Sequence, residues 1–250
     1  MKSLRSRPAT SFDVRTLLPR YPWIVAGFSE RRHGNLYRGH EDSPFNPLGR
    51  AQFSYELEIP PERIIAPVLA HGAEVRTVNA RDIDAHIEAD GLVTKEPNVF
   101  LSITTADCLP VFFVEPRRRV IAIAHAGWRG LLRGVLEATV RVLVKCGAKT
   151  SSIHVGIGPS IRSCHYSVDL VRAKKFGSYL GEDVVTRRLG QSYLDLERSA
   201  VRLLGRTGIV PAQVKSSGLC TSCDERFFSF RRDAPKGGEA MLAMIGMVDE

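Results

Sequence analysis

The chain has 250 residues, of which 44% are hydrophobic and 25% are charged, as is ordinary for a soluble globular protein. Its formal net charge of +8 favours anionic ligands such as phosphates. The charges are scattered, and no zinc-finger, RNP or basic-helix pattern accompanies them, so we expect a small anionic substrate and no nucleic-acid partner. No apolar run approaches the roughly 20 residues of a membrane-spanning helix, so we expect no membrane partner.

The cysteine count gives an expectation about location. Five cysteines are an odd number, and they follow no regular spacing. The basic N-terminus lacks the apolar core of a secretory signal. These features favour a reducing, cytoplasmic compartment, in which we expect a monomer or homodimer.

In chain order, residues 1–22 are predicted to be a loose lead-in, and 23–250 a single catalytic domain. Residues 35–50 are rich in Gly, Pro, Asn and Asp and are predicted to be irregular loop. Helices are predicted where apolar residues recur at three- and four-residue spacing. These helices cover 132–143, 167–180 and 193–205. The predicted strands cover 23–28, 74–78, 91–94, 98–104, 109–114, 120–124, 153–158, 227–230 and 241–247.

The strands at 109–114 and 120–124 are predicted to form a central hairpin. They are separated by a five-residue polar break that contains a proline. Neither strand alternates with polar residues, which is typical of a sheet covered on both faces. Because most strand connections are too short for helical crossovers, we expect one α+β domain with mixed sheets covered by helices.

The hairpin brings Cys108, just before its first strand, close to His125 at the end of its second. Thiolate and imidazole are both zinc ligands, and His71, at a bend before another strand, is the natural third. A three-ligand site would leave one position open for catalysis. Two alternatives remain: a metal-free Cys–His nucleophile pair, and a buried thiol beside a hydrogen-bonded core histidine.

Two aspartates are candidates for proton transfer or for orienting a ligating imidazole: Asp107 and Asp90. A simple turn role is the alternative for each. Three arginines at strand ends suit phosphate binding, although surface solvation is the commoner role: Arg31, Arg129 and Arg231.

A Cys-x-x-Cys pair, Cys220 and Cys223, matches half a zinc ribbon or a redox pair. No second Cys-x-x-Cys exists, so two structural thiols are the default interpretation. The neighbouring residues Cys164 and His165 are candidates to join the pair.

Four motifs in the same order resemble the YfiH-like family, also called the laccase-domain or multicopper polyphenol oxidase family. The motifs are TADCLPV (105–111), HAGWRG (125–130), IGPSI (157–161) and FFSFRRD (227–233). The resemblance implies the YfiH-like cysteine hydrolase fold and a zinc ion bound by His71, Cys108 and His125. It also implies an enzyme that splits adenosine, inosine, guanosine and methylthioadenosine with phosphate and that deaminates adenosine. Arg31 matches the arginine after the family's GFS segment.

The chain departs from the family pattern in places. Val68, Leu69 and Ala70 replace a segment that usually contains Gln, and His33-Gly34 replaces a Gly pair. The 49–71 stretch is shortened, and Cys223 is additional. The alternative functions are copper-dependent phenol oxidation, a metal-free Cys108–His125 hydrolase and an anion-binding module without catalysis. A multicopper site needs His-x-His pairs, and the chain's seven histidines form none.

Overall fold

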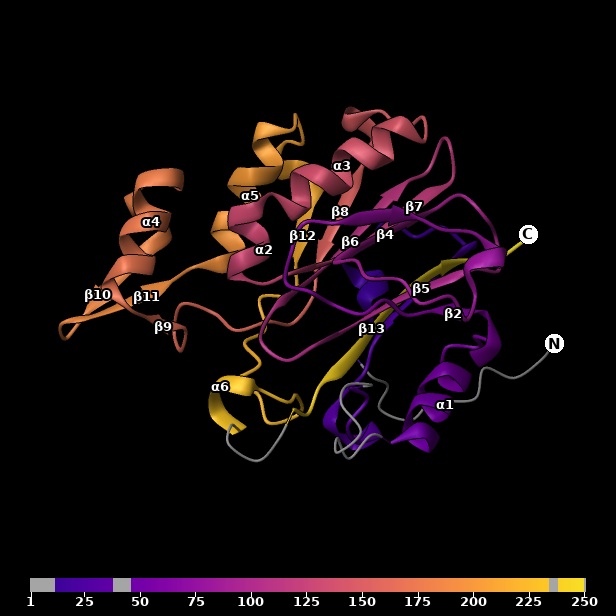
Figure 1. The fold of residues 1–250 in the computed structure, drawn as a ribbon, viewed down its shortest axis with the longest axis horizontal. Helices are drawn as coiled ribbons and strands as arrows, with labels where there is room; N and C mark the ends of the chain where they lie inside the picture. The colour runs from indigo at the N-terminus through magenta and orange to yellow at the C-terminus, as the bar shows by residue number, and fades with distance from the viewer. Residues whose placement is uncertain (1–11, 38–45, 234–237, 250) are drawn as a thin grey trace.

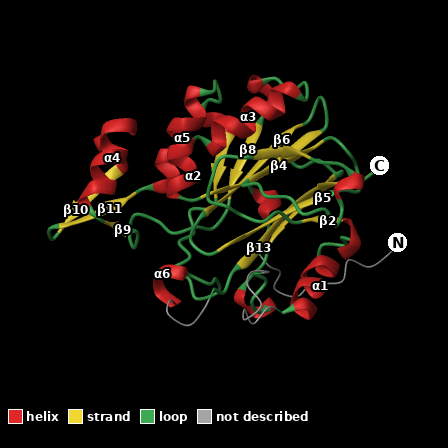
Figure 2. Cartoon of the chain, viewed as in Figure 1, coloured by secondary structure: helices red, strands yellow, loops and turns green. Residues whose placement is uncertain are grey.

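The computed structural model describes residues 12–37, 46–233 and 238–249. The start of the predicted lead-in, 1–11, lies outside these ranges. Two stacked sheets form the centre of the molecule, and helices cover both outer faces (Figure 1). A smaller three-stranded sheet, which carries one helix, extends from one end (Figure 2). The fold confirms the predicted α+β class with mixed sheets.

The larger central sheet has six strands in the order β12-β8-β6-β7-β4-β3. The predicted hairpin forms the middle of this sheet, and every side chain of its two strands is buried. Successive side chains along β6 point to opposite faces of the sheet. Val111 and Phe113 pack in the apolar cluster on one face, while Phe112 and Val114 pack in the cluster on the other. The strands are β12 (Val214–Ser216), β8 (His154–Ile157), β6 (Leu109–Glu115), β7 (Val120–Ala126), β4 (Gly91–Thr94) and β3 (Val75–Thr77).

The second sheet stacks on the first through their shared apolar cluster, which contains Ile103 and Met241 beside Phe112. Its order is β1-β13-β5-β2. These strands are β1 (Ile24–Phe28), β13 (Met241–Met247), β5 (Phe100–Thr105) and β2 (Ile64–Ile65). The small sheet consists of β10 (Val185–Arg188), β11 (Gln191–Leu194) and β9 (Ser167–Val168).

Six α-helices lie in the described residues: α1 (Pro47–Glu56), α2 (Trp128–Arg133), α3 (Val135–Lys145), α4 (Leu170–Leu180), α5 (Leu196–Arg206) and α6 (Phe230–Asp233). Helices α2, α3 and α5 cover the six-stranded sheet (Figure 1). The helix predicted at 132–143 is two helices, because Gly134 adopts a left-handed φ of 85° between them. Helices α4 and α5 confirm most of two predicted helices, and each starts after an aspartate that caps its first turn. Residues 167–168 and 193–194, which were predicted to be helical, lie instead in strands β9 and β11.

Two further local predictions were wrong. Residues 47–50 belong to α1 rather than to a loop, because Asn46 caps the backbone of Gly49 and Pro47 suits the first helical turn. The strand predicted at 227–230 is a bend that leads into α6. There the Asp233 carboxylate accepts a hydrogen bond from the Ser229 backbone, which favours a turn over extended pairing.

Part of the lead-in is not loose. Val14 and Leu18 are 0% and 2% exposed and pack into the cluster between the two sheets. The boundary between lead-in and catalytic domain stays a prediction. Among the described residues, no helix has the length and apolar character needed to cross a membrane.

Candidate metal centre

Three side chains from separate parts of the chain meet beside the central hairpin. The ligand atoms of His71, Cys108 and His125 all lie within 4.8 Å of one another. His71 precedes β3, Cys108 directly precedes β6, and His125 lies in β7 opposite Pro110. The two imidazole rings meet edge to face, with their centroids 4.8 Å apart. The structure therefore brings together the trio predicted as metal ligands.

The bend that carries His71 is held by two neighbours. His71 has a left-handed φ of 53°, which is uncommon outside glycine. The Asp90 carboxylate accepts hydrogen bonds from the backbone N–H of His71 at 2.9 Å and of Gly72 at 2.6 Å. Arg133 donates to the His71 carbonyl at 3.1 Å. These contacts fix an exposed imidazole at the edge of the site.

The same carboxylate also meets the second imidazole. Oδ1 of Asp90 lies 3.2 Å from Nδ1 of His125, and both side chains are buried. Burial by itself would raise the pKa of Asp90, but the hydrogen bonds from His125 and Gly72 hold it below its usual range. The contact leaves Nε2 of His125 free to face Cys108 or a metal ion.

Cys108 and His125 shift each other's pKa, each favouring the charged form of the other. Burial would raise the pKa of the Cys108 thiol, but the adjacent imidazoles of His125 and His71 lower it to about 6. Burial would likewise lower the pKa of His125, but the Cys108 thiolate and Asp90 raise it to about 9. At neutral pH the site therefore contains a thiolate, which is the form that binds metal.

Gly127 provides the space for this cluster. A Cβ at this position would lie 2.8 Å from Sγ of Cys108 and 3.6 Å from the His71 ring. The first distance is too short for a stable contact. Glycine thus lets the backbone at the N-terminus of α2 pass directly beside the thiolate.

The Asp107 carboxylate contacts a hydroxyl and a backbone N–H group, and its predicted role stays a prediction. Its carboxylate accepts hydrogen bonds from Oγ1 of Thr221 at 2.6 Å and from the backbone N–H of Arg231 at 2.7 Å. Its backbone has a left-handed φ of 83°. The side chain therefore braces the turn that presents Cys108.

The three predicted phosphate ligands lie in different environments. Arg231 donates to the carbonyl and hydroxyl of Ser167, both at 2.8 Å, and lies 5.2 Å from the Tyr166 ring. Arg31 forms an ion pair with Asp233 at 2.6 Å and also donates to the Glu225 and Phe227 carbonyls. Exposed Arg129 lies over the Trp128 ring at 4.6 Å. Their binding roles stay predictions.

Sequence reasoning missed two residues near the thiolate. Burial raises the pKa of Tyr166, the Cys108 thiolate adds to this effect, and Arg172 and Arg231 oppose it. Arg172 also lies over the Trp128 ring at 4.1 Å. No local motif marks either residue, because the contact of Arg172 in α4 with Trp128 in α2 joins segments that are far apart in the chain.

The chain matches a known protein family and a known crystal structure over most of its length. The family model described as multi-copper polyphenol oxidoreductase laccase matches residues 29–247. The chain is similar to the crystal structure of YlmD from Geobacillus stearothermophilus, with a TM-score of 0.83 and 30% identity. That match covers 92% of this chain and 94% of the other.

Several relatives carry the name of an activity. The chain is 36% identical over 180 residues to purine nucleoside phosphorylase YlmD of Bacillus subtilis, a match covering 69% of this chain and 64% of the relative. It is 40% identical over 161 residues to purine nucleoside phosphorylase of Deinococcus radiodurans, covering 64% and 62%. The matches thus span just under two thirds of these relatives. This chain is also 29% identical over 196 residues to adenosine deaminase RL5 of an unknown prokaryotic organism, a match covering 73% of this chain and 75% of the relative.

Proposed function

The chain belongs to the multi-copper polyphenol oxidoreductase laccase family, and from this premise we propose that it is a zinc-dependent purine nucleoside phosphorylase. Its substrates would be adenosine, inosine, guanosine and methylthioadenosine with phosphate, and adenosine deamination would be a side activity. The names of the relatives support the two reactions. The observation that carries the proposal is the convergence of His71, Cys108 and His125 within 4.8 Å.

The three side chains fit a catalytic zinc ion. Two imidazoles and one thiolate are common zinc ligands, and three protein ligands leave a fourth position for water or substrate. The Asp90 contact with Nδ1 of His125 supplies the outer carboxylate that usually accompanies a ligating imidazole. When bound, zinc would act as a Lewis acid and lower the pKa of water.

In phosphorolysis, a phosphate oxygen forms a bond to the anomeric carbon of the sugar while the bond from that carbon to the purine nitrogen breaks. The electron pair leaves with the base, which takes up a proton. We assign Arg231 to the phosphate, because its backbone N–H is tied to the turn before Cys108 and its guanidinium lies beside Tyr166. Arg31 and Arg129 are further candidates for the anion.

The two aspartates receive positioning roles. Asp90 holds the His71 bend and the His125 ring together, so it fixes the geometry of two ligands at once. Asp107 already accepts hydrogen bonds from Thr221 and Arg231, so we assign it to the Cys108 turn in place of proton transfer.

In deamination, water adds oxygen to the purine carbon that bears the amine, and ammonia leaves.

The decisive experiment is a turnover assay on purified, zinc-replete protein. Inosine with phosphate should yield free base, inosine without phosphate should not, and adenosine should release ammonia. His71→Ala should abolish both reactions, and exposed His86→Ala is the matched control. Protein that contains zinc yet releases neither base nor ammonia would refute the proposal.

One alternative is supported by the lowered pKa of Cys108 beside the raised pKa of His125, which resembles the activated nucleophile of a metal-free hydrolase. Chelators distinguish the two functions, because they should inhibit the zinc enzyme and leave a Cys–His hydrolase active. Copper-dependent phenol oxidation rests on the family name alone. Metal analysis and an assay with a phenolic substrate test it directly.

A further inference from the structure

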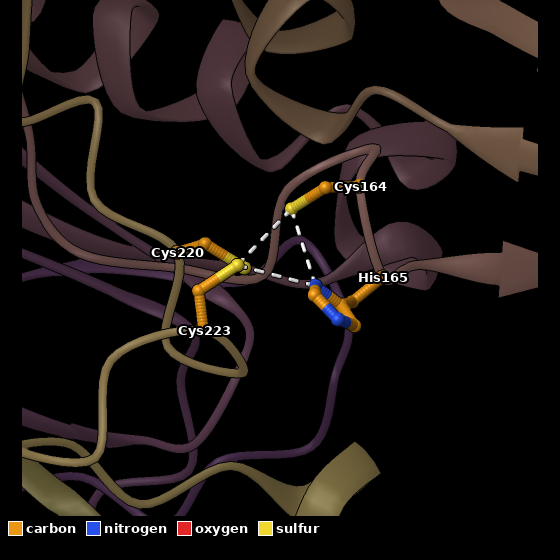
Figure 3. Close-up of side chains that lie close together, drawn as sticks. All are labelled: Cys164, His165, Cys220 and Cys223. Carbon is orange, nitrogen blue, oxygen red and sulfur yellow. Dashed lines mark hydrogen bonds between the residues drawn. The ribbon is translucent and has the colours of Figure 1, made fainter.

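A second group of metal-ligating side chains lies apart from the His71 cluster. Cys164, His165, Cys220 and Cys223 bring their sulfur and ring nitrogen atoms within 4.8 Å of one another. The first two belong to the segment between β8 and β9, and the other two to the segment between β12 and α6. Figure 3 shows the four side chains converging from these two segments on a common centre.

The spacing of the ligand atoms matches a tetrahedral zinc site. Zinc–ligand bonds of about 2.3 Å to sulfur and about 2.0–2.1 Å to nitrogen place two sulfurs about 3.8 Å apart, and a sulfur about 3.6 Å from a nitrogen. Sγ of Cys164 lies 3.5 Å from Sγ of Cys223, and Nδ1 of His165 lies 3.3 Å and 3.2 Å from these two sulfurs. A disulfide would need sulfurs about 2.05 Å apart.

The backbone of both segments is arranged to present these ligands. Strands β8 and β12 are parallel neighbours, and the pairing continues beyond them as a bridge between Ser160 and Cys220. The Cys220 carbonyl accepts from the N–H groups of Cys223 and Asp224, which closes a tight turn around the Cys-x-x-Cys pair. The Arg162 N–H donates to Sγ of Cys220 at 3.4 Å, which would stabilise a ligating thiolate.

We propose that Cys164, His165, Cys220 and Cys223 form a structural zinc site, distinct from the His71 cluster. Three thiolates and one imidazole fill all four tetrahedral positions, so this site has no open position for substrate. The proposal gives a ligand role to Cys220 and Cys223, for which the sequence alone favours two structural thiols.

The site joins two segments, and each of them donates a hydrogen bond to Asp107 in the turn before Cys108. The Ile161 N–H, three residues before Cys164, donates to the Asp107 carbonyl at 2.9 Å. Thr221, next to Cys220, donates through Oγ1 to the Asp107 carboxylate at 2.6 Å. A zinc ion between the segments would therefore fix both supports of Asp107 relative to each other.

The first test is zinc content after expression with zinc and purification under reducing conditions. Cys164→Ser and Cys223→Ser should each lose one zinc equivalent per chain relative to the unaltered protein. Cys146→Ser is the matched control, because Cys146 is the one remaining cysteine and belongs to neither cluster. Equal zinc content in all four proteins would overturn the proposal.

A second test needs no variant and therefore does not depend on how a variant folds. The full protein is alkylated with iodoacetamide, with and without added zinc, and the modified cysteines are identified by peptide mass spectrometry. Zinc should protect Cys164, Cys220 and Cys223 and leave Cys146 unchanged. Absence of protection, or a Cys164–Cys223 disulfide in the reduced preparation, would overturn the site. Because neither test uses nucleosides, failure of the proposed enzyme activity would leave this inference standing.

Discussion

The carboxylate of Asp90 lies 3.2 Å from Nδ1 of His125 and simultaneously accepts the backbone N–H groups of His71 and Gly72. One buried side chain thus joins the two imidazoles of the candidate metal centre, although they are far apart in the sequence. This arrangement ties the position of an exposed histidine to that of a buried one.

Asp90→Asn should weaken zinc binding at the His71 cluster by about 10–100-fold, the usual cost of losing an outer-shell partner. The asparagine amide keeps one acceptor oxygen, but an NH₂ group replaces the other. This NH₂ group would face another donor, such as the Gly72 N–H, and could not form a hydrogen bond with it. The measurement is the zinc concentration that half-protects Cys108 from alkylation, which reports on this cluster alone. Exposed Asp84→Asn is the control, and equal protection in both variants would contradict the assignment.

Gly127→Ala should also reduce zinc binding at the His71 cluster, because the new Cβ would lie 2.8 Å from Sγ of Cys108. The thiolate or the start of α2 must then shift. The same Cys108 protection assay measures the effect. Gly205→Ala in α5 is the matched control, since its Cβ would meet nothing within 4 Å, and the change should stabilise the helix by up to about 1 kcal/mol. Unaltered zinc protection in Gly127→Ala would show that the site has room to relax.

Alkylation of Cys108 in chelator-treated protein should depend on pH with a midpoint near 6. Burial opposes the thiolate, but His125 and His71 lower the pKa of Cys108 to about 6. Since the thiolate is the nucleophile, the rate should be high at pH 7 and fall as the pH drops through 6. His125→Asn should move the midpoint upward, toward the value of about 8.5 for a free cysteine. A midpoint near that value in the unaltered protein would refute the lowered pKa of Cys108.

Arg231→Met should raise the KM for phosphate about tenfold to a hundredfold, the equivalent of a charge-assisted hydrogen bond worth about 1.5–3 kcal/mol. The KM for the nucleoside should change much less. Steady-state kinetics with phosphate and inosine varied separately provide the measurement, and exposed Arg187→Met serves as the control. If the phosphate KM stays constant, the role of Arg231 is confined to its contacts with Ser167 and Asp107.

Local pattern is enough to predict the central hairpin and its pair of reactive side chains. Two apolar runs around a short polar break can pair in few ways, and the ends of paired strands meet. The residues alone therefore predict that Cys108 and His125 lie close together. Prediction fails where a short apolar segment suits several states, as at 227–230, where hydrogen bonds to Asp233 and Ser229 select a turn and α6.

The sequence by itself determined the hairpin and the proximity of Cys108 to His125, because these follow from contacts that are local in the chain. It also predicted the fold class, from the order and spacing of the apolar segments. Only the tertiary structure decided that Asp90 joins both imidazoles and that Asp107 braces the Cys108 turn. It likewise brought Sγ of Cys164 within 3.5 Å of Sγ of Cys223, which lies 59 positions later in the chain. The physical reason is the parallel pairing of β8 with β12, whose strand order no local pattern specifies.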